Sequence, residues 1–462
     1  MENQTENKVL RRVLVLADSP TVPTGFGVVI KNLMWQLQAT GKYWIDIIGI
    51  NFYGDFYETK DYPYRIFPAV NKNSQDLYGR PRLELALAGY DNSLKGPWDI
   101  LFTLNDHFIL ETVAPKILNY QQQFKDKGHP EQHFKWIGYC PVDSSLRENW
   151  VTQAVVKPDY PVTYTNYARD ETLKFDDKEG SLAKRLKVIY HGVNTKEFYP
   201  ISTEEKKTFR QLYFGGTVRE STFVVTNVSR NQPRKDLART MKIFAEFHKR
   251  HPDSFLYLHS KIQDAGGSLE EMARNFGLEH NKDWTTPAAF DENIGFPTEI
   301  LNKIYNISDV TLTTSLGEGW GFMLTESMAT NTLTMGPSHT AIKEILNGED
   351  ITEASRGIPV KCATTSSEWI SLGFIDNERI RPLTNVADGV EKLTWVYDHP
   401  EEAKQISQRG YEWALAHTWE IVCKDWIDLF DTAYQELEVE RTIKRNKTQQ
   451  KANRQNIARL RK

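Results

Sequence analysis

Apolar and polar positions along this chain form two successive series of short strands and amphipathic helices. In the first half, β-branched runs bounded by polar or turn residues predict strands at 11–17, 45–50, 98–103, 134–139, 161–165 and 186–190. A second series is predicted at 222–228, 254–260 and 309–314, and amphipathic stretches such as LARTMKIFAEFHKRH lie between its strands. Strands that alternate with helices indicate parallel sheets covered on both faces, so we expect an α/β chain with two doubly wound domains.

A stretch without periodicity separates the two series. Residues 190–200, YHGVNTKEFYP, carry Gly, Asn and Pro in place of a hydrophobic pattern, which is typical of an interdomain connection. The chain has 462 residues, enough for two hydrophobic cores. The expected organisation is a first domain at 1–192, a second domain at 193–415, a helix at 416–440 that follows a break near 417–420, and a tail at 441–462.

The predicted tail is strongly basic, although the whole chain has a formal net charge of -4. It contains Arg441, Lys444, Arg445, Lys447, Lys451, Arg454, Arg459, Arg461 and Lys462 and no acidic residue. Such a block is either a solvated tail or a contact for a polyanion, such as nucleic acid or an acidic membrane surface, because clustered cations release counterions from phosphates. Both interpretations stay open at this point.

The remaining composition favours a globular, cytoplasmic protein. The three cysteines form no CxxC pair, and the first twenty residues lack the long apolar stretch of a signal peptide. No uncharged apolar run of about eighteen residues predicts a membrane span.

A glycine-rich turn follows the first predicted strand. In DSPTVPTGFGVVIKNLMWQL, Gly25 and Gly27 lie between the strand and a predicted helix. This arrangement presents backbone N–H groups and a helix amino end to an anion or a sugar hydroxyl, but it also suits a tight turn that needs glycine for backbone reasons alone. A dinucleotide fingerprint is disfavoured because Ile30 replaces its third glycine and no acidic residue ends the strand at 45–50.

A basic loop, VSRNQPRKD, follows the strand at 222–228 and contains Arg230 and Lys235. Open α/β sheets bind ligands at the carboxyl ends of their strands, where this loop is expected. A forked guanidinium and a mobile ammonium suit a diphosphate. The alternative is a solvated basic loop.

Two carboxylates, Glu318 and Glu326, occur in TTSLGEGWGFMLTESMA, directly after the strand at 309–314. The apolar spacing predicts a helix that begins near Gly321, so the two residues do not share a helix face. Glu318 is expected at the loop tip and Glu326 about a turn and a half inside the helix. A nucleotide sugar would use both, whereas a metal is disfavoured because no His is nearby and no Asp-x-Asp occurs in the chain.

These motifs together resemble the family 4 retaining glycosyltransferases of the GT-B fold. EGWGFMLTE, from Glu318 to Glu326, resembles their E-x7-E motif. PTGFG, WDILFTLNDH, HGVNTKEFYP, SRNQPRKD and TWEIVCKDWIDLF agree in order and spacing. The resemblance implies two Rossmann-like domains that face a central cleft, with a C-terminal helix that crosses back onto the first domain.

The resemblance also implies roles for individual residues. Arg230 and Lys235 would hold the donor diphosphate, Glu326 would bind the ribose, and Glu318 would contact the transferred sugar. The implied donor contacts further include Gly25, Gly27, Gly319, Trp320, Gly321 and Phe322.

The candidates on the acceptor side are less specific. His107, in LNDHFIL, resembles the family's active-site histidine, but it could equally be a structural hydrogen bonder. Asp106 and Asp143 are candidates for acceptor contacts, and the alternative for Asp143 is to cap a helix that starts at Ser144.

The implied reaction is metal-independent transfer of a sugar, with retention, from a nucleotide sugar to an acceptor hydroxyl, without a cofactor. A UDP-sugar is the favoured donor. The acceptor is left open between a glycan, a lipid or a small molecule and a hydroxymethylated base in DNA, for which the basic tail at 441–462 would supply the grip. The alternative is a non-catalytic protein of the same fold that binds a nucleotide sugar or nucleic acid.

Overall fold

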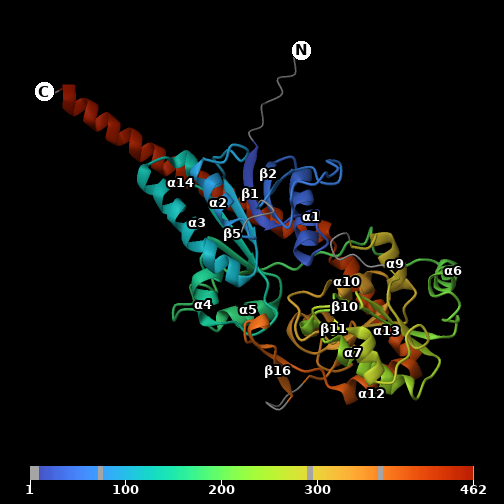
Figure 1. Cartoon of the computed structure of the whole chain (residues 1–462). Coiled ribbons are helices and arrows are strands. Elements are labelled where there is room, and N and C mark those ends of the chain that lie inside the picture. The colour runs from blue at the N-terminus through green and yellow to red at the C-terminus, as the bar shows by residue number, and fades with distance from the viewer. Residues whose placement is uncertain (1–9, 71–75, 289–294, 363–367, 461–462) are drawn as a thin grey trace.

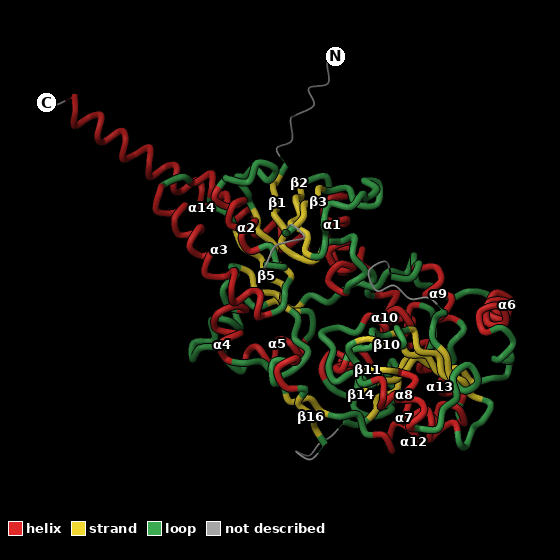
Figure 2. The backbone as a smooth tube through the Cα atoms, viewed as in Figure 1, coloured by secondary structure: helices red, strands yellow, loops and turns green. Residues whose placement is uncertain are grey.

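The computed structural model describes residues 10–70, 76–288, 295–362 and 368–460. Two parallel sheets, each covered by helices, form two domains (Figures 1 and 2). The N-terminal sheet has the order β3-β2-β1-β4-β5-β6-β7. Its strands are β1 (Arg11–Asp18), β2 (Tyr43–Ile50), β3 (Arg65–Pro68), β4 (Ile100–Leu104), β5 (Lys135–Cys140), β6 (Tyr160–Thr163) and β7 (Lys187–Val188).

Alternate residues of these strands face two separate apolar layers. On β1, Val13 and Val15 face α1 (Gly25–Ala39) and α14 (Trp419–Leu460), whereas Leu14 and Leu16 face α2 (Arg80–Ala88) and α3 (His107–Lys127). Because successive side chains of a strand point to opposite faces, a continuous apolar run is what a sheet covered on both faces requires. The short helices α4 (Glu148–Trp150) and α5 (Asn166–Leu173) complete the domain.

The C-terminal sheet has the order β12-β9-β8-β13-β14-β15. Its strands are β8 (Phe223–Val228), β9 (Ser254–His259), β12 (Trp284–Thr285), β13 (Val310–Leu312), β14 (Leu333–Pro337) and β15 (Ile358–Val360). The helices α7 (Leu237–His248), α8 (Leu269–Asn275) and α12 (Val386–Asp398) cover one face. The other helices are α6 (Thr203–Phe214), α9 (Thr298–Asn306), α10 (Phe322–Ala329), α11 (Thr340–Leu346) and α13 (Pro400–Ala416). Two small hairpins, β10 (Gln263–Asp264) with β11 (Gly267–Ser268) and β16 (Trp369–Ser371) with β17 (Ile380–Pro382), extend from this domain.

Helix α14 returns the chain to the N-terminal domain. It begins beside Gly192, where a Cβ would lie 2.5 Å from the Cα of Trp419, so only glycine permits this approach. Trp426 and Phe430 are buried against the N-terminal sheet. The helix is 42 residues long and continues beyond the domain body to Leu460 (Figure 1), so no change of secondary structure marks the predicted boundary between 440 and 441.

The structure confirms the two doubly wound domains, the returning helix and the nine predicted strands, although β7 is reduced to two residues. It adds β3, β12, β14 and β15 to the two large sheets, and the hairpin strands β10, β11, β16 and β17, none of which the hydrophobic pattern predicted. Among the described residues, no helix has both the length and the apolar character needed to cross a bilayer.

Candidate active site

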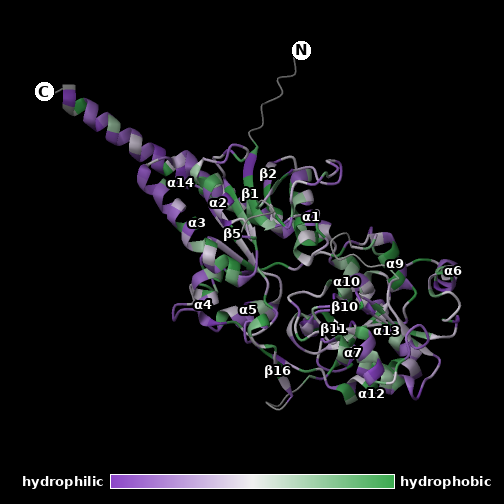
Figure 3. Ribbon diagram, in the orientation of Figure 1, coloured by the Kyte–Doolittle hydropathy of each residue, from purple (hydrophilic) through white to green (hydrophobic). Residues whose placement is uncertain are grey.

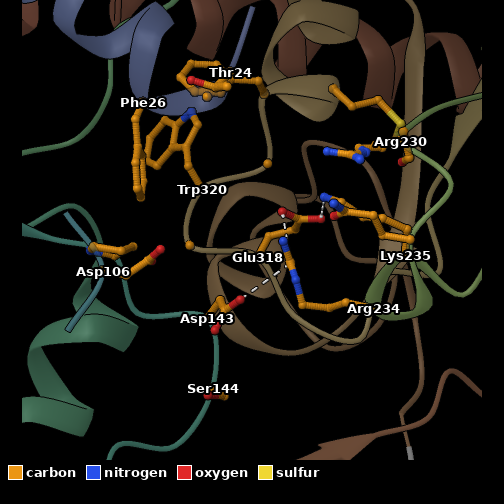
Figure 4. Close-up of a pocket in the computed structure, with 18 of the residues that line it drawn as sticks. Thr24, Phe26, Asp106, Asp143, Ser144, Arg230, Arg234, Lys235, Glu318 and Trp320 are labelled. Carbon is orange, nitrogen blue, oxygen red and sulfur yellow. Dashed lines mark hydrogen bonds and ion pairs between the residues drawn. The ribbon is translucent and has the colours of Figure 1, made fainter. Parts of the chain in front are cut away.

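A cavity of about 720 Å³ lies between the two domains, where loops that follow the strands of both sheets meet. Figure 4 shows Asp106, Asp143 and Ser144 on the N-terminal side and Arg230, Arg234, Lys235 and Glu318 on the C-terminal side. The predicted residues that line the cavity are Gly25, Asp106, His107, Asp143, Arg230, Lys235, Glu318, Gly319, Trp320, Gly321, Phe322 and Glu326. The structure thus brings together candidates that lie up to 301 positions apart in the sequence, from Gly25 to Glu326.

Glu318 is the centre of a charged cluster on the C-terminal side. The Lys235 ammonium donates to its Oε1 at 2.5 Å, and the Arg234 guanidinium lies 3.6 Å from its Oε2. Burial alone would raise the pKa of Glu318, but the positive charges of Lys235 and Arg234 lower it to about 2. The carboxylate therefore stays ionised, and it is a partner of the basic loop instead of a solvated group at a loop tip.

Arg230 lies farther from this cluster. Its Nε donates to Asp264 Oδ2 at 2.9 Å, and half of its side chain is exposed. Lys235 is only 17% exposed. Both predicted cations line the same cavity, but Lys235 is held inside it whereas Arg230 lies at its rim.

Glu326 has a different environment from Glu318 despite belonging to the same motif. Helix α10 begins at Phe322 after Gly321, as predicted, so the two carboxylates leave the backbone at different levels. Glu326 Oε2 accepts a hydrogen bond from the Tyr305 hydroxyl at 2.7 Å. Burial raises the pKa of Glu326 to about 7, against the opposing effect of that hydrogen bond.

The glycine-rich turn brings the N-terminal domain to the same cavity. Thr24 caps α1 by accepting from the Gly27 N–H at 3.0 Å, and its hydroxyl donates to Asp18 at 2.6 Å. A Cβ at Gly27 would lie 2.3 Å from the Val22 carbonyl oxygen, so the turn itself requires glycine there. Gly25 lines the cavity and packs against the Phe322 ring, whereas Gly27 is not among the residues that line the cavity. Gly25 is therefore the closer match to the expected donor contact.

Asp106 and His107 form the N-terminal wall, where β4 passes into α3. Burial, followed by the charge of Asp143, raises the pKa of Asp106 to about 7. The His107 ring stacks on Trp150 with centroids 5.5 Å apart, its Nε2 is buried without a hydrogen-bond partner, and burial lowers its pKa to about 4. His107 is therefore a neutral imidazole at neutral pH.

Asp143 joins the two domains and does not cap a helix. α4 begins only at Glu148, so no helix starts at Ser144, and the alternative interpretation of Asp143 as its cap is wrong. Instead, Arg381 donates to the Asp143 carbonyl at 2.7 Å and to its Oδ1 at 3.3 Å, and Arg234 lies 3.5 Å from its Oδ2. The backbones meet at Gly317, where a Cβ would lie 2.1 Å from the Asp143 carbonyl oxygen.

The connection at 190–200 also contributes a buried contact to the cleft. His191 is 2% exposed, and its Nδ1 is 2.9 Å from the Tyr139 hydroxyl. Its ring stacks on Phe322 and lies edge-on to Trp320, both of which belong to the other domain. Trp320 is 4% exposed, so it chiefly supports the loop that carries Glu318.

Sequence reasoning did not identify several residues of this site: Tyr305, Trp150, Arg234, Arg379 and Arg381. Arg234 stands beside Lys235 in QPRKD, and that adjacency could have identified it. Arg379 and Arg381 belong to the hairpin β16–β17, for which the sequence shows no comparable signal. Among the described residues, no three His, Cys, Asp or Glu side chains gather as a metal site would require. The requirement for no metal stays a prediction.

Comparison with known proteins gives one match by sequence and many by structure. No family model matches the chain. An uncharacterized glycosyltransferase of Methanocaldococcus jannaschii, MJ1607, is 27% identical over 167 residues, which cover 36% of this chain and 39% of that protein. The chain thus matches well under half of that relative's length.

The structural matches extend over nearly the whole chain. Sucrose-phosphate synthase from Thermosynechococcus elongatus has a TM-score of 0.67 at 15% identity, and the match covers 93% of this chain and all of that one. HepE from Anabaena, in complex with UDP and glucose, has a TM-score of 0.63 at 12% identity over 91% of this chain and 100% of that one. The catalytic domain of Arabidopsis thaliana starch synthase IV, bound to ADP and acarbose, has a TM-score of 0.58 at 12% identity over 93% of this chain and 99% of that one. The two parallel sheets, the cleft between them and the returning helix give this chain the GT-B fold.

Proposed function

We propose that the chain is a retaining glycosyltransferase that transfers a sugar from a nucleoside diphosphate sugar, with a UDP-sugar favoured, to an acceptor hydroxyl. The observation that carries the proposal is the cluster of Arg234, Lys235 and Glu318 beside the amino end of α10, across one cavity from Asp106 and His107. The fold, the glycosyltransferase match and the UDP present in the HepE structure support it.

The leaving group sets the main electrostatic task of such a reaction. Negative charge develops on the diphosphate as the glycosidic bond breaks, and preorganised donors in a water-poor site stabilise it. Lys235 and Arg234 supply two fixed cations, Arg230 a third at the rim, and the backbone N–H groups at the start of α10 add partial positive charge. This set performs the task in the proposed reaction without a metal.

The positions of the two glutamates suggest separate roles. Glu326 has a pKa of about 7 and is ionised above that pH, where its carboxylate would accept hydrogen bonds from the ribose hydroxyls. Glu318, always ionised, would contact the sugar and orient Lys235 toward the diphosphate. The sugar would pass through an oxocarbenium-like state, and the acceptor would arrive on the face that the phosphate leaves.

The N-terminal wall suits the acceptor. Asp106 can change its protonation near neutral pH, and the neutral His107 has an unpartnered Nε2 for a hydroxyl. Contacts between the walls, such as Arg381 with Asp143, join the two domains, and closure of the cleft during the reaction would exclude water that could otherwise hydrolyse the donor.

A donor-by-acceptor transfer screen tests the proposal. UDP-, GDP- and ADP-sugars would be combined with glycans, lipid acceptors, small-molecule alcohols and hydroxymethylated duplex DNA, without and with added divalent metal. We expect transfer with a UDP-sugar, unchanged by a chelator, and a product whose anomeric configuration in NMR spectra is that of the donor. Nucleotide-sugar binding without transfer or donor hydrolysis would instead support a non-catalytic binding protein, and an inverted product would refute retention.

A further inference from the structure

The edge of the N-terminal domain farthest from the cleft carries a second hollow, of about 480 Å³. Arg12, Trp44 and Arg65 line it at or near the amino ends of β1, β2 and β3, and Lys95 lines it from the loop before β4. Because β1 is eight residues long and strands rise by about 3.3 Å per residue, this edge is about 25 Å from the cleft. The hollow is therefore separate from the candidate active site.

The hollow combines cations with an exposed aromatic ring. Asp46 is fully buried beneath it and pairs with Arg65 at 2.6 Å, with Arg12 at 3.8 Å. Two cations thus flank one carboxylate, and the exposed Lys95 adds a third cation to the lining of the hollow. The Trp44 indole is 42% exposed with the Arg65 guanidinium 5.2 Å from its centroid. An exposed indole beside arginines is a platform on which an unpaired base can stack.

The distal part of α14 leaves the domain next to this hollow. Arg441 donates to Asp99 Oδ1 at 2.7 Å, and Asp99 Oδ2 accepts from the backbone N–H of Arg12, so one aspartate links the helix to the hollow. Beyond Arg441 the helix projects from the body (Figure 1) and carries no acidic residue. Spacings of three and four residues place Lys444, Lys447, Lys451 and Arg454 on one face of it.

The distal helix is mostly hydrophilic in the view of Figure 3, with a few hydrophobic residues between the hydrophilic ones. Its large exposed apolar side chains in the described part beyond Arg441 are Ile443 and Ile457, which lie near opposite ends of the segment. A helix that lies on a membrane needs a continuous apolar face to bury, and this one lacks it. A polyphosphate backbone requires only cations, because phosphate contacts release counterions.

We propose that this edge binds nucleic acid at a site distinct from the cleft. The cationic face of α14 contacts backbone phosphates, and Trp44 stacks an unpaired base in the hollow. The site is independent of the proposed transfer reaction. It recognises the phosphodiester backbone by charge, without a sugar acceptor, and the Trp44 ring favours single strands over duplex because it stacks an unpaired base.

Fluorescence anisotropy of the full chain with labelled single-stranded DNA, duplex DNA and RNA of one sequence, over a series of KCl concentrations, tests the helix. The helix variant carries Lys447→Gln, Lys451→Gln and Arg454→Gln. These substitutions remove three charges, and glutamine has a helix propensity similar to those of lysine and arginine. The matched control carries Lys178→Gln, Lys184→Gln and Lys404→Gln at exposed positions elsewhere. We expect the helix variant to lose at least tenfold in affinity and to reduce the slope of log affinity against log salt by about 2, at about 0.7 per contact.

Trp44→Ala tests the hollow. We expect it to weaken single-strand binding by about fivefold or more and to leave duplex binding unchanged, since stacking on an aromatic ring requires an unpaired base. Equal affinity and salt slope in the helix variant and the control would overturn the proposal, as would tighter binding to phosphatidylserine vesicles than to any oligonucleotide. UDP affinity separates an effect on this edge from an effect on the cleft. We expect it to stay unchanged in these variants, which would show that loss of nucleic-acid binding does not reflect damage to the cleft.

Discussion

The two walls of the cleft differ in how their charges are held. On the C-terminal wall, Glu318 is paired with Lys235 and Arg234, which lower its pKa to about 2, so it stays ionised at neutral pH. On the N-terminal wall, burial raises the pKa of Asp106 to about 7, and His107 stays neutral. The fixed charges around Glu318 suit the stabilisation of a departing diphosphate over a wide pH range, whereas the titratable Asp106 suits handling of an acceptor proton. The comparison predicts that substitutions in the Glu318 cluster and at Asp106 have different pH signatures.

Lys235→Ala breaks the Glu318 cluster and is expected to have the largest effect. Removal of the cation leaves Glu318 with Arg234 alone and deprives the diphosphate of its deepest partner, so kcat/KM should fall by roughly 30- to 1,000-fold, about 2 to 4 kcal/mol. Titration calorimetry with UDP should show weakened affinity. Arg230→Ala should have a smaller effect because this side chain is half exposed and pairs with Asp264. Lys207→Ala, at an exposed ion pair on the same domain, is the control. Unchanged UDP affinity in Lys235→Ala and Arg230→Ala would remove both residues from the donor site.

Glu318→Gln and Glu326→Gln compare two carboxylates of the same wall. Glu318→Gln should lower kcat on the order of a hundredfold and leave UDP affinity nearly intact. Glu326→Gln should weaken UDP by roughly tenfold, since a charged hydrogen-bond acceptor is lost. UDP affinity of the unsubstituted protein should increase as pH rises through about 7, where Glu326 ionises, and that dependence should vanish in Glu326→Gln. Equal loss of UDP affinity in both variants would contradict the separate roles.

Asp106→Asn tests the titratable side chain through stability. The folded-state pKa of Asp106 is raised to about 7, above its unfolded value, so the folded state retains a proton that the unfolded state has lost. Asp106 therefore costs stability increasingly as pH rises from about 4 to 7, and the full cost remains above that range. The variant should have a Tm about 2 to 4 °C higher at pH 8 and an unchanged Tm at pH 4. A Tm difference that is the same at both pH values would show that Asp106 ionises normally.

Truncation of the distal helix should affect neither wall and gives the smallest expected effect. A chain ending at Asn446 keeps Arg441 with its contacts to Asp99 and the His133 carbonyl. Its free energy of unfolding and its turnover of a small acceptor should stay within about 0.5 kcal/mol and twofold, respectively. A chain ending at Glu440 loses a buried arginine and should be measurably less stable in urea. If both truncations reduce small-acceptor turnover equally, the distal helix acts on the cleft.

The fold was largely predictable because its signal is periodic. Runs such as RRVLVLA are apolar on both alternating sets of positions, which only a sheet covered on two faces satisfies. β14 and β15 are not predicted by the sequence pattern, because LTMGP and IPV contain Gly or Pro, which are disfavoured within strands. Their strand conformation depends on pairing with parallel neighbours, β14 with β13 and β15 with β14. The distal α14 was predicted as a tail because it lacks an apolar face.

The candidate site was most predictable in the segments that follow strands. Arg230, Lys235, Glu318 and Asp106 lie in such segments, and the cavity contains all four. The hydrogen-bond partners of other site residues come from elsewhere in the chain: Tyr305 donates to Glu326, and Arg381 donates to Asp143. No local pattern encodes these pairs. Tyr305 and Glu326 lie on different helices, α9 and α10, and the Arg381–Asp143 pair forms only where the β16–β17 hairpin meets the N-terminal domain.

Gly317 lies at a close backbone contact between the two domains. Its missing side chain leaves just enough room for the Asp143 carbonyl of the opposite domain, since a Cβ would lie only 2.1 Å away. A methyl group there would also lie 2.5 Å from the Arg381 guanidinium, so we expect the Gly317→Ala substitution to hold the two domains apart and to displace Arg381. Such a protein would provide an open-state reference for scattering or crystallographic work, in which ligand entry is separated from ligand turnover.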